Sequence, residues 1–226
     1  MTKVDHLRNV PIFSDLKDLD LERIASKMVP REYEKGQMII LEETQGETFF
    51  IITRGAVKVT RLSDDGREVI LAILGESDFF GEMSLLDGEG RSANIVANES
   101  AHMLTLSRRN FLSCLESYPK IAIALLQELA IRLRKSDQQI ESLSLSDSEQ
   151  RIGITLIRLA EELGKIKHGH VSIKNLPYQQ DIANMAGTSR ETVSRTLKLL
   201  EDKLLVKRQS RDLTIYNFDA FRQAFS

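Results

Sequence analysis

The chain has 226 residues, of which 42% are hydrophobic and 28% charged, and its formal net charge is −2. No apolar run approaches the ~18 residues of a membrane-spanning helix, and the N-terminus lacks the pattern of a secretory signal, so we expect a soluble, cytoplasmic protein with no membrane partner. The single cysteine, Cys114, excludes an intramolecular disulfide and a cysteine-ligated zinc or iron–sulfur site, and we expect it to be buried.

The charge is divided unevenly along the chain. From residue 151 onward there are 13 Lys and Arg against 8 Asp and Glu, whereas the residues before it have 18 against 25. A basic C-terminal part behind an acidic N-terminal part indicates that only the C-terminal part meets a polyanion such as nucleic acid. Chance unevenness is the alternative.

Residues 5–108 give a short helical segment followed by strands. Leu16, Leu19, Ile24 and Met28 have roughly helical spacing before residue 29. From 29 to 108, short apolar runs such as "TFFIITRGAVKVTRL" alternate with turn residues. This pattern predicts a small antiparallel barrel or roll.

The hydrophobic period lengthens after residue 108, where "NFLSCLES" predicts a short helix and Pro119 suits the first turn of the next one. A seam with alternating spacings of three and four then follows at Leu126, Leu129, Leu133, Ser136, Ile140 and Leu143. Such a seam predicts a coiled-coil dimer helix over 119–145, with packing onto the helix's own domain as the alternative. A new unit begins near residue 146, where Ser146 or Ser148 can cap a helix.

The stretch "QQDIANMAGTSRETVSRTLKLLED" fits two helices around a turn. Gly187 stands at the turn, where a positive φ is expected, and Thr188 or Ser189 can cap the second helix. Val193, Leu197 and Leu200 form the buried stripe of that second helix. The pattern predicts a helix-turn-helix whose second helix enters the major groove of DNA.

The exposed residues of this second helix suit base recognition. Arginine can donate two hydrogen bonds to guanine, and glutamate can accept from cytosine. A simple surface ion pair between Glu191 and Arg195 is the alternative, but the basic stretch "VKRQSR" that follows favours DNA. The residues expected to meet DNA are Gln180, Thr188, Ser189, Arg190, Glu191, Thr192, Arg195 and Lys198.

The loop "FFGEMSLLDGEGRSA" places Arg91 after two glycines and two acids inside the β-rich part. A surface hairpin needs neither the "GE" before this turn nor the "RSA" after it. Together with "SRETVSR", this loop resembles the CRP/FNR family of bacterial transcription regulators, and the resemblance covers nearly the whole chain.

The resemblance implies an α+β fold in three parts. These are an N-terminal antiparallel β-roll of the cyclic-nucleotide-binding type (1–118), a dimerisation helix (119–145) and a winged helix-turn-helix domain (146–226). It also implies a ligand-gated homodimer, not an enzyme, that reads a TGTGA-like palindrome in double-stranded DNA and contacts RNA polymerase. The expected effector is cyclic AMP or a related cyclic nucleotide, with no metal, haem or iron–sulfur cluster.

The resemblance gives the loop residues roles that their chemistry supports. Arg91 would pair with the cyclic phosphate, Ser92 would donate to the same oxygens, and Glu82 would accept from the ribose 2′-hydroxyl. Ser136 would contact the base, but Asp137 stands where the family has a second hydroxyl, which leaves the identity of the base open. The full expected set is Gly81, Glu82, Met83, Ser84, Arg91, Ser92, Ala93, Ser136, Asp137 and the apolar Val59, Leu71 and Leu74. A β-roll that is inert, or that binds another ligand such as a cyclic dinucleotide, is the alternative.

Overall fold

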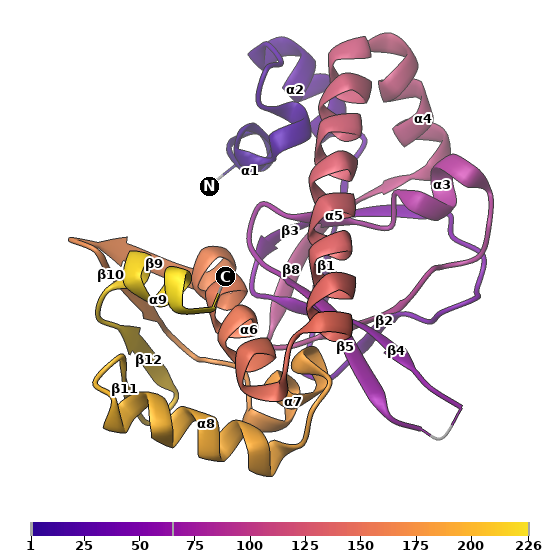
Figure 1. The fold of residues 1–226 in the computed structure, drawn as a ribbon. Coiled ribbons are helices and arrows are strands. Elements are labelled where there is room, and N and C mark those ends of the chain that lie inside the picture. The colour runs from indigo at the N-terminus through magenta and orange to yellow at the C-terminus, as the bar shows by residue number, and fades with distance from the viewer. Residues whose placement is uncertain (1, 65, 226) are drawn as a thin grey trace. The chain divides into compact units, whose positions relative to one another are not determined.

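The computed structural model describes residues 2–64 and 66–225, which form two compact units (Figure 1). The first unit comprises residues 1–61 and 71–135, and the second comprises 62–70 and 136–226. Each unit has its own hydrophobic core.

The N-terminal helical periodicity resolves into short elements: α1 (Lys3–Asn9), the 3-10 turn η1 (Pro11–Phe13) and α2 (Asp18–Ser26). Thr2 caps α1 in a reciprocal capping box with Asp5. Ile24 and Met28 are buried as expected, but Leu19 is 59% exposed, so its assignment to the helical face was wrong. The helix containing Leu19 is only nine residues long and presents a narrow apolar face.

Eight strands form the predicted antiparallel roll. They are β1 (Val29–Tyr33), β2 (Met38–Ile40), β3 (Thr48–Arg54), β4 (Val57–Leu62), β5 (Glu68–Leu74), β6 (Phe79–Phe80), β7 (Asn94–Ala97) and β8 (Ala101–Ser107). They make two four-stranded sheets, in the orders β1-β8-β3-β6 and β2-β7-β4-β5. The fold class predicted from the sequence is therefore confirmed.

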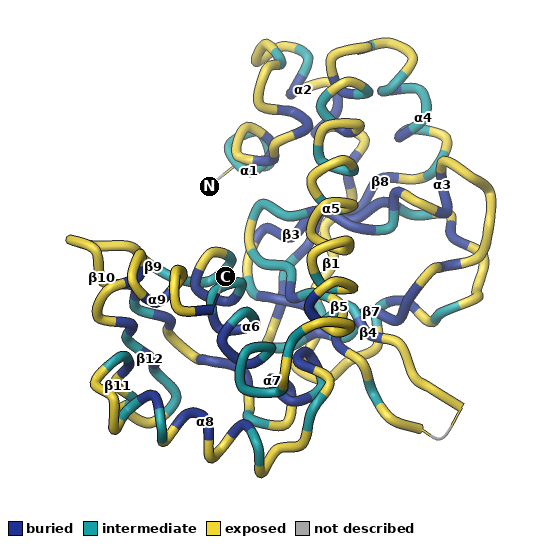
Figure 2. The backbone as a smooth tube through the Cα atoms, in the orientation of Figure 1, coloured by how far each residue is buried: buried dark blue, intermediate teal, exposed yellow. Residues whose placement is uncertain are grey.

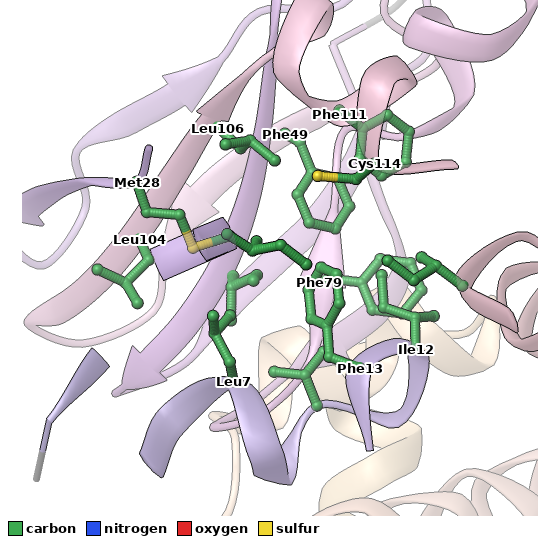
Figure 3. Close-up of a cluster of buried hydrophobic side chains, with 14 of the residues drawn as sticks. Leu7, Ile12, Phe13, Met28, Phe49, Phe79, Leu104, Leu106, Phe111 and Cys114 are labelled. Carbon is green, nitrogen blue, oxygen red and sulfur yellow. The ribbon is translucent and has the colours of Figure 1, made fainter. Parts of the chain in front are cut away.

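Strand β3 separates two apolar clusters because its side chains alternate between the faces of its sheet. Phe50 and Ile52 point into the roll, where Phe50 stacks on Phe80 with ring centroids 4.8 Å apart. Phe49 and Ile51 point outward and pack against the helices (Figure 3). Cys114 lies in this outer cluster, which confirms that it is a buried thiol.

Three helices complete the chain up to residue 145: α3 (Met83–Asp87), α4 (Arg108–Ser117) and α5 (Pro119–Leu145). Pro119 occupies the first turn of α5, as expected. Much of α5 is exposed (Figure 2), and Leu126, Leu133 and Ile140 of the seam are 61–66% exposed. Leu129, by contrast, is only partly buried and packs against the outer cluster, so its place in the seam stays a prediction.

The remaining elements are α6 (Ser148–Leu163), β9 (Gly164–Lys167), β10 (His170–Ile173), α7 (Gln179–Ala186), α8 (Arg190–Asp202), β11 (Val206–Gln209), β12 (Asp212–Ile215) and α9 (Phe218–Phe225). The strands form one sheet in the order β11-β12-β10-β9. The N-cap of α6 is Asp147, whose side chain accepts from Gln150 N at 2.9 Å, rather than Ser146 or Ser148. A carboxylate is as good a cap as a hydroxyl, and its position sets the start of the helix.

Helix α9 packs on α6 through aromatic rings. A Cβ at Gly153 of α6 would lie 2.2 Å from the ring of Phe225, so only glycine lets the two helices meet there. Within the described residues, no helix is both long and apolar enough to cross a membrane.

Candidate ligand and nucleic-acid sites

Two glycines shape the loop between β6 and β7. Gly81 has φ +85°, and a Cβ there would lie 2.8 Å from Arg91 Nη1 and 2.9 Å from Thr48 O. Gly88 ends α3 in the left-handed conformation. Glycine is the residue that adopts such backbone angles without strain, and here it also lets the backbone approach the arginine.

Arg91 is held inside this loop at 7% exposure. Its Nη1 donates to Gly81 O (2.8 Å) and Ser84 Oγ (2.9 Å), and its Nη2 donates to Thr48 O (2.8 Å). Burial lowers the pKa of Arg91, while Glu82 and Glu47 act to raise it. These bonds engage three of the five N–H groups of the guanidinium, so among the described residues Nε–H and one Nη2 hydrogen are left for an anion.

Glu82 is the second charged group of the loop and is 3% exposed. Its Oε1 accepts from Arg132 Nη1 at 3.0 Å, whereas Oε2 is buried without a hydrogen-bond partner among the described residues. Burial raises the pKa of Glu82, and Arg132 opposes that rise. A buried acceptor that lacks a donor is costly unless a ligand supplies the hydrogen bond.

Arg132 of α5, which sequence reasoning did not single out, is the second charged partner in this site. Besides Glu82, it donates to Phe79 O at 2.8 Å and lies 4.4 Å above the centroid of the Phe79 ring. The available signal was its spacing: Arg132 precedes Ser136 by one helical turn, so both lie on one face of α5.

The other expected ligand residues divide into three groups. Ser84 and Ala93 are buried in the loop, and exposed Ser92 contacts Met83 Sδ at 3.7 Å. Val59 and Leu74 are half-buried against the inner cluster of the roll, while Leu71 is 37% exposed. Ser136 and Asp137 are exposed on α5. The roles of these residues stay predictions.

The loop therefore offers a fixed cation with free N–H groups and, joined to it through Gly81, a buried acceptor that lacks a donor. This combination of a hydrogen-bond donor and an acceptor suits a small ligand that has both an anionic group and a hydroxyl group. Among the described residues, no group of three His, Cys, Asp or Glu side chains could hold a metal ion.

The turn between α7 and α8 has the predicted geometry. Gly187 adopts φ +59° at the C-cap of α7, and its N–H donates to Ala183 O. Ser189, not Thr188, caps α8 by accepting from Thr192 N at 3.2 Å. Val193 and the other two stripe residues, Leu197 and Leu200, are buried.

The outer surface of α8 is polar and exposed. Arg190, Glu191, Arg195 and Lys198 all lie on this exposed surface. Arg195 Nη2 donates to Thr192 Oγ1 at 3.3 Å. Hydrogen bonds from its own backbone and from Ser189 hold the pKa of Glu191 below its ordinary value. On α7, Gln180 donates to Asn184 Oδ1 at 2.9 Å.

Arg151, which sequence reasoning also missed, ties this turn to the start of α6. It donates to Ala186 O (2.8 Å), Gly187 O (3.1 Å) and Ser146 O (2.7 Å). Its only sequence signal is its position at the start of the basic part of the chain. Three carbonyls on one guanidinium fix the turn against α6.

Two arginines of the stretch "VKRQSR", residues 206–211, are bonded to other residues of their own domain. Arg208 is bonded to both carboxylate oxygens of Glu201, and Arg211 donates to Leu176 O and lies 4.4 Å above the Tyr178 ring centroid. These bonds fasten the stretch to its own domain without removing the charge of Arg211, and the part that "VKRQSR" plays in DNA binding stays a prediction.

Comparisons with known proteins match both parts of the chain to family models. Residues 30–118 match the cyclic nucleotide-binding domain model, and residues 150–224 match the Crp-like helix-turn-helix domain model. A cyclic AMP receptor protein of Thermus thermophilus is 33% identical and covers 89% of this chain and 90% of its own length.

Two solved structures share the fold. FixK2 from Bradyrhizobium japonicum gives a TM-score of 0.78 at 22% identity, over 88% of this chain and 98% of that one. The c-di-GMP responsive global regulator CLP from Xanthomonas campestris gives 0.74 at 22% identity, over 89% of this chain and 100% of that one.

A cyclic-nucleotide-binding roll followed by a helix-turn-helix domain defines a DNA-binding transcription regulator. The chain belongs to the CRP/FNR family of these regulators.

Proposed function

We propose that the chain is a homodimeric regulator whose β-roll binds a cyclic nucleotide, with cyclic AMP as the first candidate. The observation that carries this proposal is the pairing of Arg91, which keeps two N–H groups free, with the partnerless Oε2 of Glu82. Arg91 would take the ring phosphate, and Glu82 would accept from the ribose hydroxyl. The Thermus relative, named as a cyclic AMP receptor, supports this choice.

The remaining loop and wall residues would complete the pocket. Gly81 would let the ligand approach the backbone, and Ser92 would donate to the phosphate. The apolar and loop residues around the ligand would be Val59, Leu71, Leu74, Met83, Ser84 and Ala93.

The proposal leaves open which base the bound nucleotide carries. Ser136 would contact it, and Asp137 offers a carboxylate that accepts from an amino group but opposes an acceptor on the base. A guanine-containing ligand, including a cyclic dinucleotide, is therefore the second candidate. The fold shared with a regulator described as c-di-GMP responsive supports keeping it.

The dimer would form along α5, where Leu126, Leu133 and Ile140 leave an exposed apolar seam. Each copy would then present α8 to a half-site of a TGTGA-like palindrome. RNA polymerase would be the protein partner at the promoter.

Isothermal titration with cyclic AMP, cyclic GMP and cyclic di-GMP tests the ligand proposal. Charge-assisted hydrogen bonds contribute about 1.5–3 kcal/mol, so R91Q should weaken binding of the preferred nucleotide by about 10- to 100-fold. Arg54, exposed at the end of β3, supplies the control R54Q, which should bind like the wild type. If the wild type binds none of the three nucleotides, the ligand assignment is wrong.

A further inference from the structure

The segment between β2 and β3, residues 41–47, is bonded to the loop between β6 and β7, residues 81–93; we call residues 41–47 the covering loop and residues 81–93 the anion loop. Glu43 N donates to Arg91 O at 2.9 Å, and Arg91 N donates to Thr44 O at 2.9 Å. Gln45 and Gly90 form an antiparallel bridge. The covering loop therefore pins the backbone on both sides of the arginine that the proposed function assigns to the phosphate.

Gly46 is the residue of the covering loop at which an added side chain would meet that of Arg91. A Cβ on Gly46 would lie 2.2 Å from Ser84 Oγ and 2.5 Å from both Cζ and Nε of Arg91. Gly46 is buried, and its φ lies outside the left-handed region. Its backbone conformation therefore does not itself require glycine. The site requires glycine here because glycine has no side chain.

The groups that a side chain at position 46 would displace are the ends of two side chains. Both Ser84 and Arg91 are buried, and they are bonded to each other at 2.9 Å. Arg91 would have to leave its acceptors Gly81 O and Thr48 O, because the space behind it is filled. The backbone around the loop need not move, so the position of the guanidinium would change while the fold is kept.

We propose that Gly46 is a positioning residue of the effector site: the absence of its side chain sets the depth at which Arg91 is held. The proposal deepens the proposed function and rests on it for the identity of the anion. It adds residue 46 of the covering loop to the residues that the proposed function assigns to the effector site.

The first test compares G46A with G75A. Gly75 is the matched control, since its φ also lies outside the left-handed region and a Cβ there would have nothing within 4 Å. Titration with cyclic AMP should show G46A weakened by at least about tenfold and G75A within about twofold of the wild type. Thermal unfolding checks that both variants fold.

A double-mutant cycle separates positioning from a general structural role. If Gly46 acts through Arg91, adding G46A to R91Q should change the affinity by less than about twofold. Adding S84G to G46A should recover at least about threefold, because it removes the hydroxymethyl group that confines the guanidinium. A G46A affinity within twofold of the wild type, or an equal loss in the R91Q background, overturns the proposal.

A readout without ligand keeps the two proposals separate. In ¹⁵N-labelled protein, the Nε–H resonance of Arg91, assigned by its loss in R91Q, should shift in G46A and stay in place in G75A. If the wild type binds no cyclic nucleotide, the proposed function fails, and this resonance still tests Gly46. An unchanged resonance in G46A contradicts the positioning role.

Discussion

Glu82 is a buried carboxylate that is only half satisfied by the residues that the structure describes. One carboxylate oxygen is paired with Arg132, and the other is buried without a donor. Evolution commonly pairs or hydrogen-bonds buried charges, because desolvation is costly. The unpaired oxygen is the strongest residue-level sign of a ligand hydroxyl in this chain.

The raised pKa of Glu82 predicts a pH dependence of stability. Burial lifts its folded pKa above the unfolded value near 4.5, so the folded state holds the proton more tightly. The contribution of Glu82 to the free energy of unfolding is therefore largest below the unfolded pKa and falls as pH rises through the folded pKa. Urea unfolding of the wild type and E82Q from pH 4.5 to 7.5 measures it.

The difference in unfolding free energy, wild type minus E82Q, should decrease across that range. A constant difference would show that the Arg132 ion pair balances the desolvation of Glu82, and an increase with pH would show that the ion pair outweighs it; either result contradicts the prediction.

At the scale of elements, the prediction for DNA binding concerns two exposed residues of α8. Arg190 is exposed at the first turn of α8, and Lys198 is exposed two turns further along. If Arg190 reads a base edge, R190A should relax preference at one base position by ~1–3 kcal/mol, whereas K198A, as a phosphate contact, should weaken all duplexes alike.

Fluorescence anisotropy with a set of single-base-substituted TGTGA duplexes at fixed salt measures both variants. A uniform loss for R190A across the whole set would make Arg190 a phosphate contact instead.

Some features of the helices and strands could be predicted from the sequence alone, and others could not. The short strands separated by turns, the turn at Gly187 and the cap at Ser189 depend on residues that are neighbours in the chain. These predictions are confirmed. The inward packing of Leu129 and the Glu82–Arg132 pair depend on residues brought together from distant segments. A periodic pattern shows that a helix has an apolar face, but it does not say which flank meets its own core.

The same limit applied to the anion loop. The sequence of the loop predicts that Arg91 and Glu82 contact a ligand, because an arginine that follows a glycine-rich turn stands out among its neighbours in the chain. Gly46 has no local signal of this kind; its proposed role rests on the 2.2–2.5 Å that would separate an added Cβ from side chains 38 and 45 residues further along the chain. The three internal acceptors of Arg91 were hidden for the same reason.

At the scale of the whole molecule, regulation requires that ligand and DNA favour the same state of the dimer. A nucleotide that bound both states equally would shift nothing, however tightly it bound. If cyclic AMP strengthens DNA binding by some factor, DNA must strengthen cyclic AMP binding by the same factor. Under the proposed function, this reciprocity would couple ligand binding at the anion loop to DNA binding at α8.

The most direct test of this account is anisotropy of a palindromic TGTGA-type duplex, titrated with protein at fixed salt, with and without cyclic AMP. The salt must be fixed because the phosphate contribution alone shifts affinity by orders of magnitude. The account predicts that the nucleotide tightens binding by at least about tenfold, or about 1.4 kcal/mol of coupling, and that R91Q abolishes this difference. Equal DNA binding with and without cyclic AMP in the wild type would contradict it.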